Sequence, residues 1–294
     1  MRNFAILAIL LSSGVAHAQM RAFDNSKAIL PWIYNPASDF TMDFQAYVGY
    51  DGRGNSSYTP QSIIAGLRMP VERGRRRRSS RDRTPSSMIG VQMLNVSQDM
   101  LKTSTINASF AHQVVLSKKV RLAMGLGAGI FNMEYDTDDL VYFDQNDPLL
   151  GNGESFFNVH LNAGFALIVE DMLVINLASP YLIKDNRANV KEIIFRVSHI
   201  LTLAADVKMI TSANLDTYNN NLIYGGDVRM EWKGMVSVMA GADRYKYHGG
   251  LLLNIKPFSL GYAYGQNYRN TFGYVPSHQI SIFSHIPSSP AAWR

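Results

Sequence analysis

Apolar and polar residues alternate one by one along much of this chain. Between residues 120 and 130, Met124 and Leu126 fall on one face of an extended chain, while Gly125 and Gly127 fall on the other. A period of two is the period of side chains along a β-strand, so the pattern predicts strands rather than helices. The same alternation is clear in three further stretches: 157–169, 222–232 and 257–265.

Segments of this kind predict fourteen strands joined by connections of uneven length. Connections after even-numbered strands are mostly short, as at Glu170-Asp171, whereas several after odd-numbered strands are long, as at 135–153. Short turns at one end and longer loops at the other are typical of an outer-membrane barrel, whose short turns face the periplasm. The predicted strands are 42–50, 61–69, 87–95, 103–116, 119–134, 154–168, 172–179, 192–203, 206–213, 222–232, 235–243, 246–255, 257–265 and 277–285.

The polar faces of these strands consist mainly of Gly, Ala, Ser and Asn. The outer face of a soluble sandwich would carry many Lys, Glu and Thr instead, whereas a narrow lumen needs small side chains. The composition agrees with a barrel, because only 17% of the residues are charged, below the roughly 25% of soluble domains. The predicted fold class is therefore all-β, a transmembrane antiparallel β-barrel of about 14 strands.

The first eighteen residues have the features of an export signal. Arg2 precedes the apolar stretch 4–11, and Ala16-His17-Ala18 is a small-x-small cleavage site. The chain has no Cys, which excludes disulfides and thiolate metal sites. The expected divisions are a signal peptide at 1–18, a periplasmic N-terminal segment at 19–41, an outer-membrane barrel at 42–286 and a C-terminal tail at 287–294.

Positive charge is concentrated in one connection, residues 70–86. The chain has a formal net charge of +5, and this connection carries seven arginines against Glu72 and Asp82, so the rest is close to neutral. Adjacent guanidinium groups repel one another and cannot form a packed core. The segment either binds an acidic protein face, a lipid phosphate or a cell-wall polymer, or is a solvated loop. The arginines are Arg73, Arg75, Arg76, Arg77, Arg78, Arg81 and Arg83.

Tyr34-Asn35-Pro36-Ala37 precedes the first predicted strand. The proline ring disfavours helix at the preceding residue, so this motif is expected to be extended or to form a turn. Two interpretations remain open. The motif is either a turn that leads into the first strand, which is the commoner case, or a segment that plugs or lines the periplasmic mouth of the barrel.

Two further groups of residues are candidate sites. Oxygen ligands at alternate positions suit Ca²⁺, but the acidic loop has no EF-hand spacing, so a solvated loop is the preferred interpretation. Residues 227, 229 and 231 alternate along a predicted strand and so share its lumen face. They form either a cross-strand charge ladder or the ordinary polar lining of a lumen. The acidic-loop residues are Asp136, Asp138, Asp139, Asp144, Asn146 and Asp147, and the alternating residues are Asp227, Arg229 and Glu231.

No catalytic, metal or cofactor site is predicted. The seven His residues show no metal-ligand spacing, and no nucleophile motif is present. Because the basic charge is confined to one connection, nucleic acid is not an expected partner. Aromatic residues near strand ends are expected in the interfacial girdles of a membrane barrel: Tyr47, Tyr50, Tyr224, Trp232 and Tyr264.

Both ends of the chain resemble a known family. The relevant stretches are Trp32-Ile33-Tyr34-Asn35-Pro36-Ala37, Leu260-Gly261-Tyr262-Ala263-Tyr264 and Ser277-His278-Gln279-Ile280-Ser281-Ile282. They resemble the PorP/SprF family of Bacteroidota outer-membrane proteins, with its aromatic-Asn-Pro-Ala start and Gly-Tyr-x-Tyr penultimate strand. The Arg-rich connection and the tail after residue 286 depart from the family pattern.

The resemblance implies a non-enzymatic component of the type IX secretion system in a Gram-negative, Bacteroidota-like outer membrane. Such a barrel would link exported or surface-anchored proteins, including gliding adhesins, to a periplasmic ring. Its implied partners are lipoproteins of the secretion machinery and secreted surface proteins, with outer-membrane lipids around it. Two alternatives remain: a channel or transporter for small or hydrophobic molecules, and a purely structural outer-membrane protein.

Overall fold

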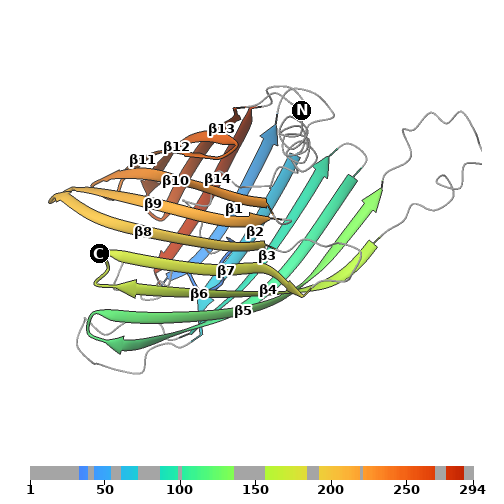
Figure 1. The fold of residues 1–294 in the computed structure, drawn as a ribbon, viewed down its shortest axis with the longest axis horizontal. Coiled ribbons are helices and arrows are strands. Elements are labelled where there is room, and N and C mark those ends of the chain that lie inside the picture. The colour runs from blue at the N-terminus through green and yellow to red at the C-terminus, as the bar shows by residue number, and fades with distance from the viewer. Residues whose placement is uncertain are drawn as a thin grey trace, which may run out of the picture.

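The computed structural model describes the barrel strands and a short segment that precedes them. The described residues are 33–38, 43–53, 61–71, 87–98, 101–135, 156–183, 192–218, 221–268 and 276–287. Within these ranges the chain forms fourteen antiparallel strands closed into one barrel (Figure 1). Every strand pairs with its neighbours in sequence, and the last pairs with the first from Asp43↔Pro287 to Arg53↔Ser277. The described part of the chain has no helix that is long and apolar enough to span a membrane.

The strands are β1 (Asp43–Arg53), β2 (Gln61–Pro70), β3 (Ser87–Gln98), β4 (Leu101–Ser117), β5 (Val120–Tyr135), β6 (Phe156–Val169), β7 (Leu173–Ile183), β8 (Glu192–Ala204), β9 (Val207–Tyr218), β10 (Asn221–Trp232), β11 (Val236–Asp243), β12 (Lys246–Ile255), β13 (Phe258–Asn267) and β14 (Ser277–Pro287). Each of the fourteen predicted strands overlaps one of these. The predicted fold class is confirmed, and the differences are confined to strand ends.

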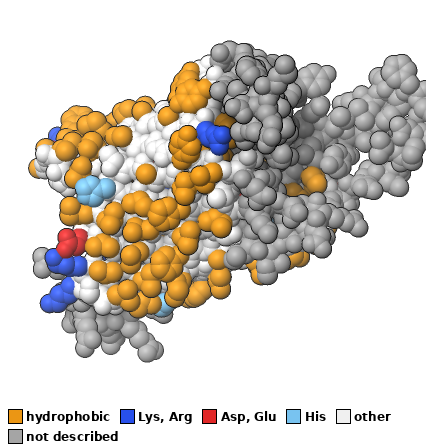
Figure 2. All heavy atoms as spheres, viewed as in Figure 1, with side chains coloured by type: hydrophobic (Ala, Val, Ile, Leu, Met, Phe, Trp, Pro, Cys, Tyr) orange, Lys and Arg blue, Asp and Glu red, His pale blue; other side chains and the backbone are white. Residues whose placement is uncertain are grey.

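The outer surface of the barrel is apolar, as the alternation predicted. Leu126 is 66% exposed and Phe157 is 62% exposed, and hydrophobic side chains cover much of the face in Figure 2. Gly125 on the same strand as Leu126 is buried, because successive side chains point to opposite faces. A soluble protein rarely exposes so large an apolar surface, whereas a barrel presents it to lipid.

One predicted outward residue is wrong. Tyr47 was expected in an aromatic girdle, but it is only 3% exposed and packs in the lumen against Ile64 and Phe283. The reason is parity: Tyr47 and Tyr50 lie three residues apart on β1, so they cannot share a face. Tyr50, Tyr224 and Trp232 do lie exposed on the outside.

The two ends of the barrel differ in their connections. At one end, called here the short-turn end, the connections after β4, β6, β8, β10 and β12 contain two or three residues. The left side of Figure 1 shows this end, with the β8–β9 hairpin projecting from it. The opposite end has both long and short connections. Residues 136–155 separate β5 from β6, but only Arg244 and Tyr245 separate β11 from β12. β1 begins at the short-turn end and β14 ends there.

Charged residues join neighbouring turns at the short-turn end. Glu170 and Asp171 both have positive φ, 55° and 58°, as a type I′ hairpin turn requires. Lys119 Nζ lies 2.5 Å from Glu170 Oε1, and Arg121 is ion-paired with Asp171. The hydrogen bond and charge of Glu170 raise the pKa of Lys119. These pairs are exposed, so they fix turn geometry more than they add stability.

Candidate functional site in the barrel lumen

Residues Ile33 to Ser38, called here the N-terminal segment, lie inside the barrel. Asn35, Pro36, Ala37 and Ser38 are all buried, and Ala37 is 0% exposed. Ser38 stands only five residues before Asp43, where β1 begins, and five Cα–Cα steps span at most about 18 Å. The segment therefore occupies the part of the lumen nearest the short-turn end.

Asn35 folds the segment into a compact turn. Its side-chain Oδ1 accepts a hydrogen bond from the Ala37 backbone N–H at 2.9 Å, and its carbonyl accepts one from the Ser38 N–H at 3.0 Å. The Ser38 hydroxyl donates to the same carbonyl at 2.9 Å. An Asn side chain that bonds its own backbone two residues on is a recognised turn former, and Pro36 fixes φ at the next position.

Arg68 on β2 binds the main chain of this turn. Its Nη1 donates to Ser38 O at 2.5 Å, and its Nη2 donates to Pro36 O at 2.7 Å. Arg68 is only 2% exposed. A buried guanidinium requires acceptors, and the segment supplies two carbonyl oxygens. Gln92 on β3 adds a longer hydrogen bond, from its Nε2 to Ile33 O at 3.3 Å.

Asn35 also binds a second part of the barrel wall. Its Nδ2 donates to Phe165 O on β6 at 3.0 Å and to Asn176 Oδ1 on β7 at 3.2 Å. Together with Arg68 and Gln92, these bonds join the segment to β2 and β3 and also to β6 and β7. The segment thus connects two separate parts of the wall from inside the barrel.

Small residues on β5 and β6 make room for the turn. A Cβ at Gly125 would lie 2.8 Å from the Pro36 carbonyl carbon and 2.9 Å from the Ala37 nitrogen, which is too close. A Cβ at Gly164 would collide with the Asn35 side chain. Ala37 packs with two buried wall residues, Ala123 and Ala166. We call the wall residues that contact the segment the cradle: Arg68, Gln92, Ala123, Gly125, Gly164, Phe165, Ala166 and Asn176.

An apolar cluster fills the neighbouring part of the lumen. Tyr47, Ile64 and Phe283 from β1, β2 and β14 are buried together, and Ile33 packs against them. The N-terminal segment therefore contacts both the polar cradle and this apolar cluster. Water is excluded from the buried residues of both.

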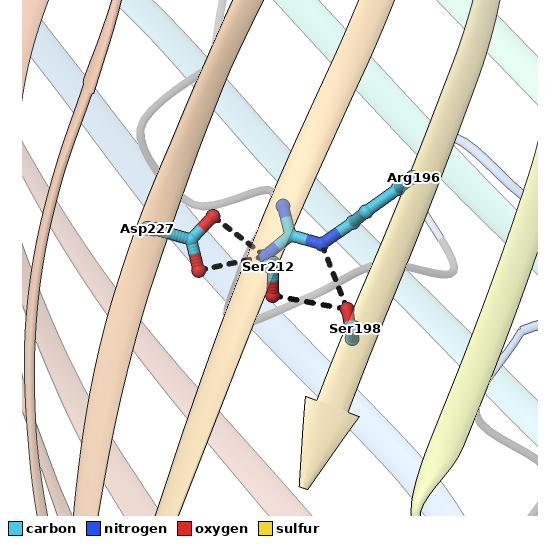
Figure 3. Close-up of polar contacts among 4 residues, drawn as sticks. All are labelled: Arg196, Ser198, Ser212 and Asp227. Carbon is cyan, nitrogen blue, oxygen red and sulfur yellow. Dashed lines mark hydrogen bonds and ion pairs between the residues drawn. The ribbon is translucent and has the colours of Figure 1, made fainter.

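A buried ion pair lies on the other side of the lumen (Figure 3). Arg196 on β8 donates from Nη2 to both carboxylate oxygens of Asp227 on β10, at 2.7 and 2.8 Å. Its Nε donates to Ser198 Oγ at 3.4 Å, and Ser198 is hydrogen-bonded to Ser212 on β9 at 3.0 Å. The Asp227 side chain is 4% exposed. The pair reaches across β9, so these contacts connect β8, β9 and β10 on the lumen side.

Asp227, Arg229 and Glu231 do face the lumen, but they form no single ladder. Arg229 and Glu231 approach to 3.9 Å along their own strand, while Asp227 binds Arg196 two strands away. The alternation on β10 placed Asp227 on the correct face. The alternation could not predict that Arg196 is the partner of Asp227. It shows which residues of a strand face inward, but not which residues of two non-adjacent strands come close inside the barrel.

The other predicted sites lie outside the described residues. These are the seven arginines of the connection between β2 and β3, and the acidic loop between β5 and β6. By strand order, the arginine connection joins the barrel at the short-turn end. Among the described residues, no group of three or more His, Cys, Asp or Glu side chains is placed to hold a metal ion.

A closed barrel with an apolar outer belt, its lumen partly occupied by inward-facing side chains and the N-terminal segment, defines an outer-membrane β-barrel protein. Solved outer-membrane barrels have the same fold at low identity. Omp33 of Acinetobacter baumannii is 7% identical, with a TM-score of 0.51 over 83% of this chain and 98% of that chain. The toluene transporter TbuX of Ralstonia pickettii is 11% identical, with a TM-score of 0.52 over 87% and 93%. The toluene transporter TodX of Pseudomonas putida is 9% identical, with a TM-score of 0.52 over 90% and 94%. Identities this low show the fold alone.

The family is established by sequence. Residues 55–283 match the family of type IX secretion system membrane proteins PorP/SprF, and the chain belongs to this family. No curated protein matches the chain. The family resemblance noted at the two ends of the chain is therefore confirmed across the strands between them.

Proposed function

We propose that this protein is a non-enzymatic outer-membrane component of the type IX secretion system that links exported or surface-anchored proteins, such as gliding adhesins, to periplasmic machinery. The observation that carries this proposal is the match of residues 55–283 to the family of type IX secretion membrane proteins. A lumen partly occupied by the chain's own N-terminal segment agrees with a docking component better than with an open pore. The expected cell is Bacteroidota-like, and residues 1–18 are expected to direct export.

The arginine connection is the proposed contact with the machinery. It lies at the short-turn end, which faces the periplasm in barrels of this class. Arginine pairs with carboxylates in a planar fork, so an acidic face of a periplasmic lipoprotein is the partner that its chemistry favours. A connection of this length at the short-turn end is unusual, and a contact would account for it.

Replacing Arg75, Arg76, Arg77 and Arg78 by Ser tests this contact. The variant is expected to insert into the membrane and to lose co-purification of periplasmic lipoproteins from detergent-solubilised membranes. The wild-type interaction should also weaken as salt rises, because exposed charges are screened beyond about 8 Å at physiological ionic strength. A double variant, Lys118→Ser with Lys256→Ser, removes positive charge from other turns at the same end and should retain the partner. Equal recovery with all three proteins would refute the docking role.

The second candidate is a channel for small or hydrophobic molecules. Two of the solved barrels with this fold are described as toluene transporters, but their low identity supports the fold only. The closely packed N-terminal segment weighs against a freely open channel. Steady ion flux across liposomes that contain the purified wild-type protein would favour this alternative instead.

A further inference from the structure

We propose that the cradle is a peptide-binding site, that the N-terminal segment occupies it as a removable plug, and that a second peptide with the same Asn-Pro-Ala turn can take its place. This inference concerns how the lumen is closed. It stands independently of the proposed role in secretion.

The cradle lacks the side chains that would fill it. Inward-facing side chains fill the interior of an eight-stranded barrel, whereas wider barrels leave room in the lumen for other groups. Here the inward positions opposite the segment are Ala123 and Gly125 on β5 and Gly164 and Ala166 on β6. The N-terminal segment supplies the missing volume. If it left, the polar groups of the cradle would face a gap that water can enter.

The cradle recognises mainly the peptide backbone. Arg68 and Gln92 donate three hydrogen bonds to residues 33–38, and these three go to main-chain carbonyls, those of Ile33, Pro36 and Ser38. A separate peptide would present the same carbonyls. The site therefore does not depend on the segment being covalently joined to β1.

Two positions of the segment set its specificity. Asn35 is required because its Nδ2 bonds Phe165 O and Asn176, while its Oδ1 forms the turn. Ala37 has no exposed surface and packs against Ala123 and Ala166, so a larger side chain would not fit. The expected ligand is a short peptide with Asn, then Pro, then a small residue.

The N-terminal segment can leave without breaking the barrel wall. In the described part of the chain, residues 33–38 belong to no strand ladder, and β1 is paired on both sides by β14 and β2. The bonds that hold the segment are made by side chains of the cradle and one carbonyl. Closure of the barrel and closure of the lumen are therefore separate properties.

Ion conductance of the purified full-length protein in planar lipid bilayers tests the plug. The wild type is expected to show no steady current. The double variant Asn35→Ala, Arg68→Ala should show continuous conductance, because it removes the bonds of the segment to β2, β6 and β7 and leaves only the longer bond from Gln92. The control is the double variant Arg196→Gln, Asp227→Asn, which alters an inward-facing charge pair away from the segment and should stay closed. A β-rich circular dichroism spectrum establishes that each variant is folded.

Exchange is tested on a second variant, Asn35→Ala, Arg68→Lys, which is also expected to conduct and which keeps a cation in the cradle. A hexapeptide with the sequence of residues 33–38, added at the short-turn side, should reduce its current. The same six residues in scrambled order should not. Block by both peptides, or by neither, would overturn the claim of a specific peptide site. A wild type that conducts freely, or a folded open variant that does not conduct, would overturn the plug.

A cross-link provides a test that needs no loss of contacts. The chain has no Cys, so the pair Ala37→Cys, Ala166→Cys should form a disulfide on oxidation, seen as a mobility change that reduction reverses. The pair Ala37→Cys, Ala263→Cys, with the second residue on β13, should not. Equal cross-linking of both pairs, or of neither, would contradict the placement of the segment. Because none of these measurements involves a secretion partner, their failure would leave the proposed function unaffected.

Discussion

Arg196 and Asp227 form the best-defined charge pair in the described part of the lumen. Both carboxylate oxygens of Asp227 accept from one guanidinium nitrogen, and the side chains are 13% and 4% exposed. Burial makes each charge costly on its own, whereas the two together satisfy one another. The pair is therefore expected to matter most when only one of its members is removed.

Arg196→Ala should destabilise the barrel by about 3 kcal/mol, because it leaves the Asp227 carboxylate buried without its partner. The double variant Arg196→Ala, Asp227→Asn should cost less, since no uncompensated charge remains. Urea unfolding in lipid vesicles, arranged as a double-mutant cycle, measures both. If the single and double variants lose the same stability, the pair carries no coupling and this interpretation is wrong.

At the scale of a strand, the lipid-facing and lumen-facing residues have different surroundings. β5 directs Leu126 to the lipid and Gly125 to the N-terminal segment, so adjacent residues experience hydrocarbon and a packed lumen. Position along the strand matters as well. Leu126 lies well inside the sixteen residues of β5, whereas Leu260 lies close to the short turn that precedes β13.

Leu126→Arg should therefore destabilise the barrel by about 2–4 kcal/mol, the range for Arg near the middle of the bilayer. Leu260→Arg should cost less, about 0–1 kcal/mol if it lies at the interface. The same vesicle unfolding measurement applies, with Leu126→Phe as an apolar control that should change stability little. Equal costs for the two Arg variants would mean that the hydrocarbon layer is not positioned as the strand ends suggest.

At the scale of the whole molecule, the barrel has a defined polarity. The N-terminal segment, the arginine connection and five connections of two or three residues all belong to the short-turn end. Barrels of this class place their short turns in the periplasm. The plug and the proposed docking contact then lie on the same side of the membrane, where the secretion machinery would meet them.

Single cysteines test this orientation in a chain that has none of its own. Cysteine at Arg244, in the β11–β12 turn of the opposite end, should react with a membrane-impermeant maleimide on intact cells. Cysteine at Ala205, in the β8–β9 turn, should react only after the outer membrane is permeabilised. Both positions are exposed, so a reversed labelling pattern would invert the assigned orientation.

The sequence by itself determined the strands, their number and their outward faces. A period of two depends only on neighbouring residues, so Leu126, Trp232 and Leu260 could be assigned to the lipid face one strand at a time. The prediction of Tyr47 as a girdle residue was wrong, because Tyr47 and Tyr50 are three residues apart on β1 and their side chains point to opposite faces. Short motifs at the two ends of the chain also indicated the family.

Only the tertiary structure decided what fills the lumen. The bonds from Arg68 to Pro36 and Ser38 connect residues 32 and 30 positions apart, and Asn35 meets Asn176 across 141 positions. Arg196 and Asp227 likewise meet only because β8 and β10 curve around a common interior. Such contacts follow from the closure and register of the whole sheet. Local alternation shows which side chains point inward, but it cannot show which of them meet.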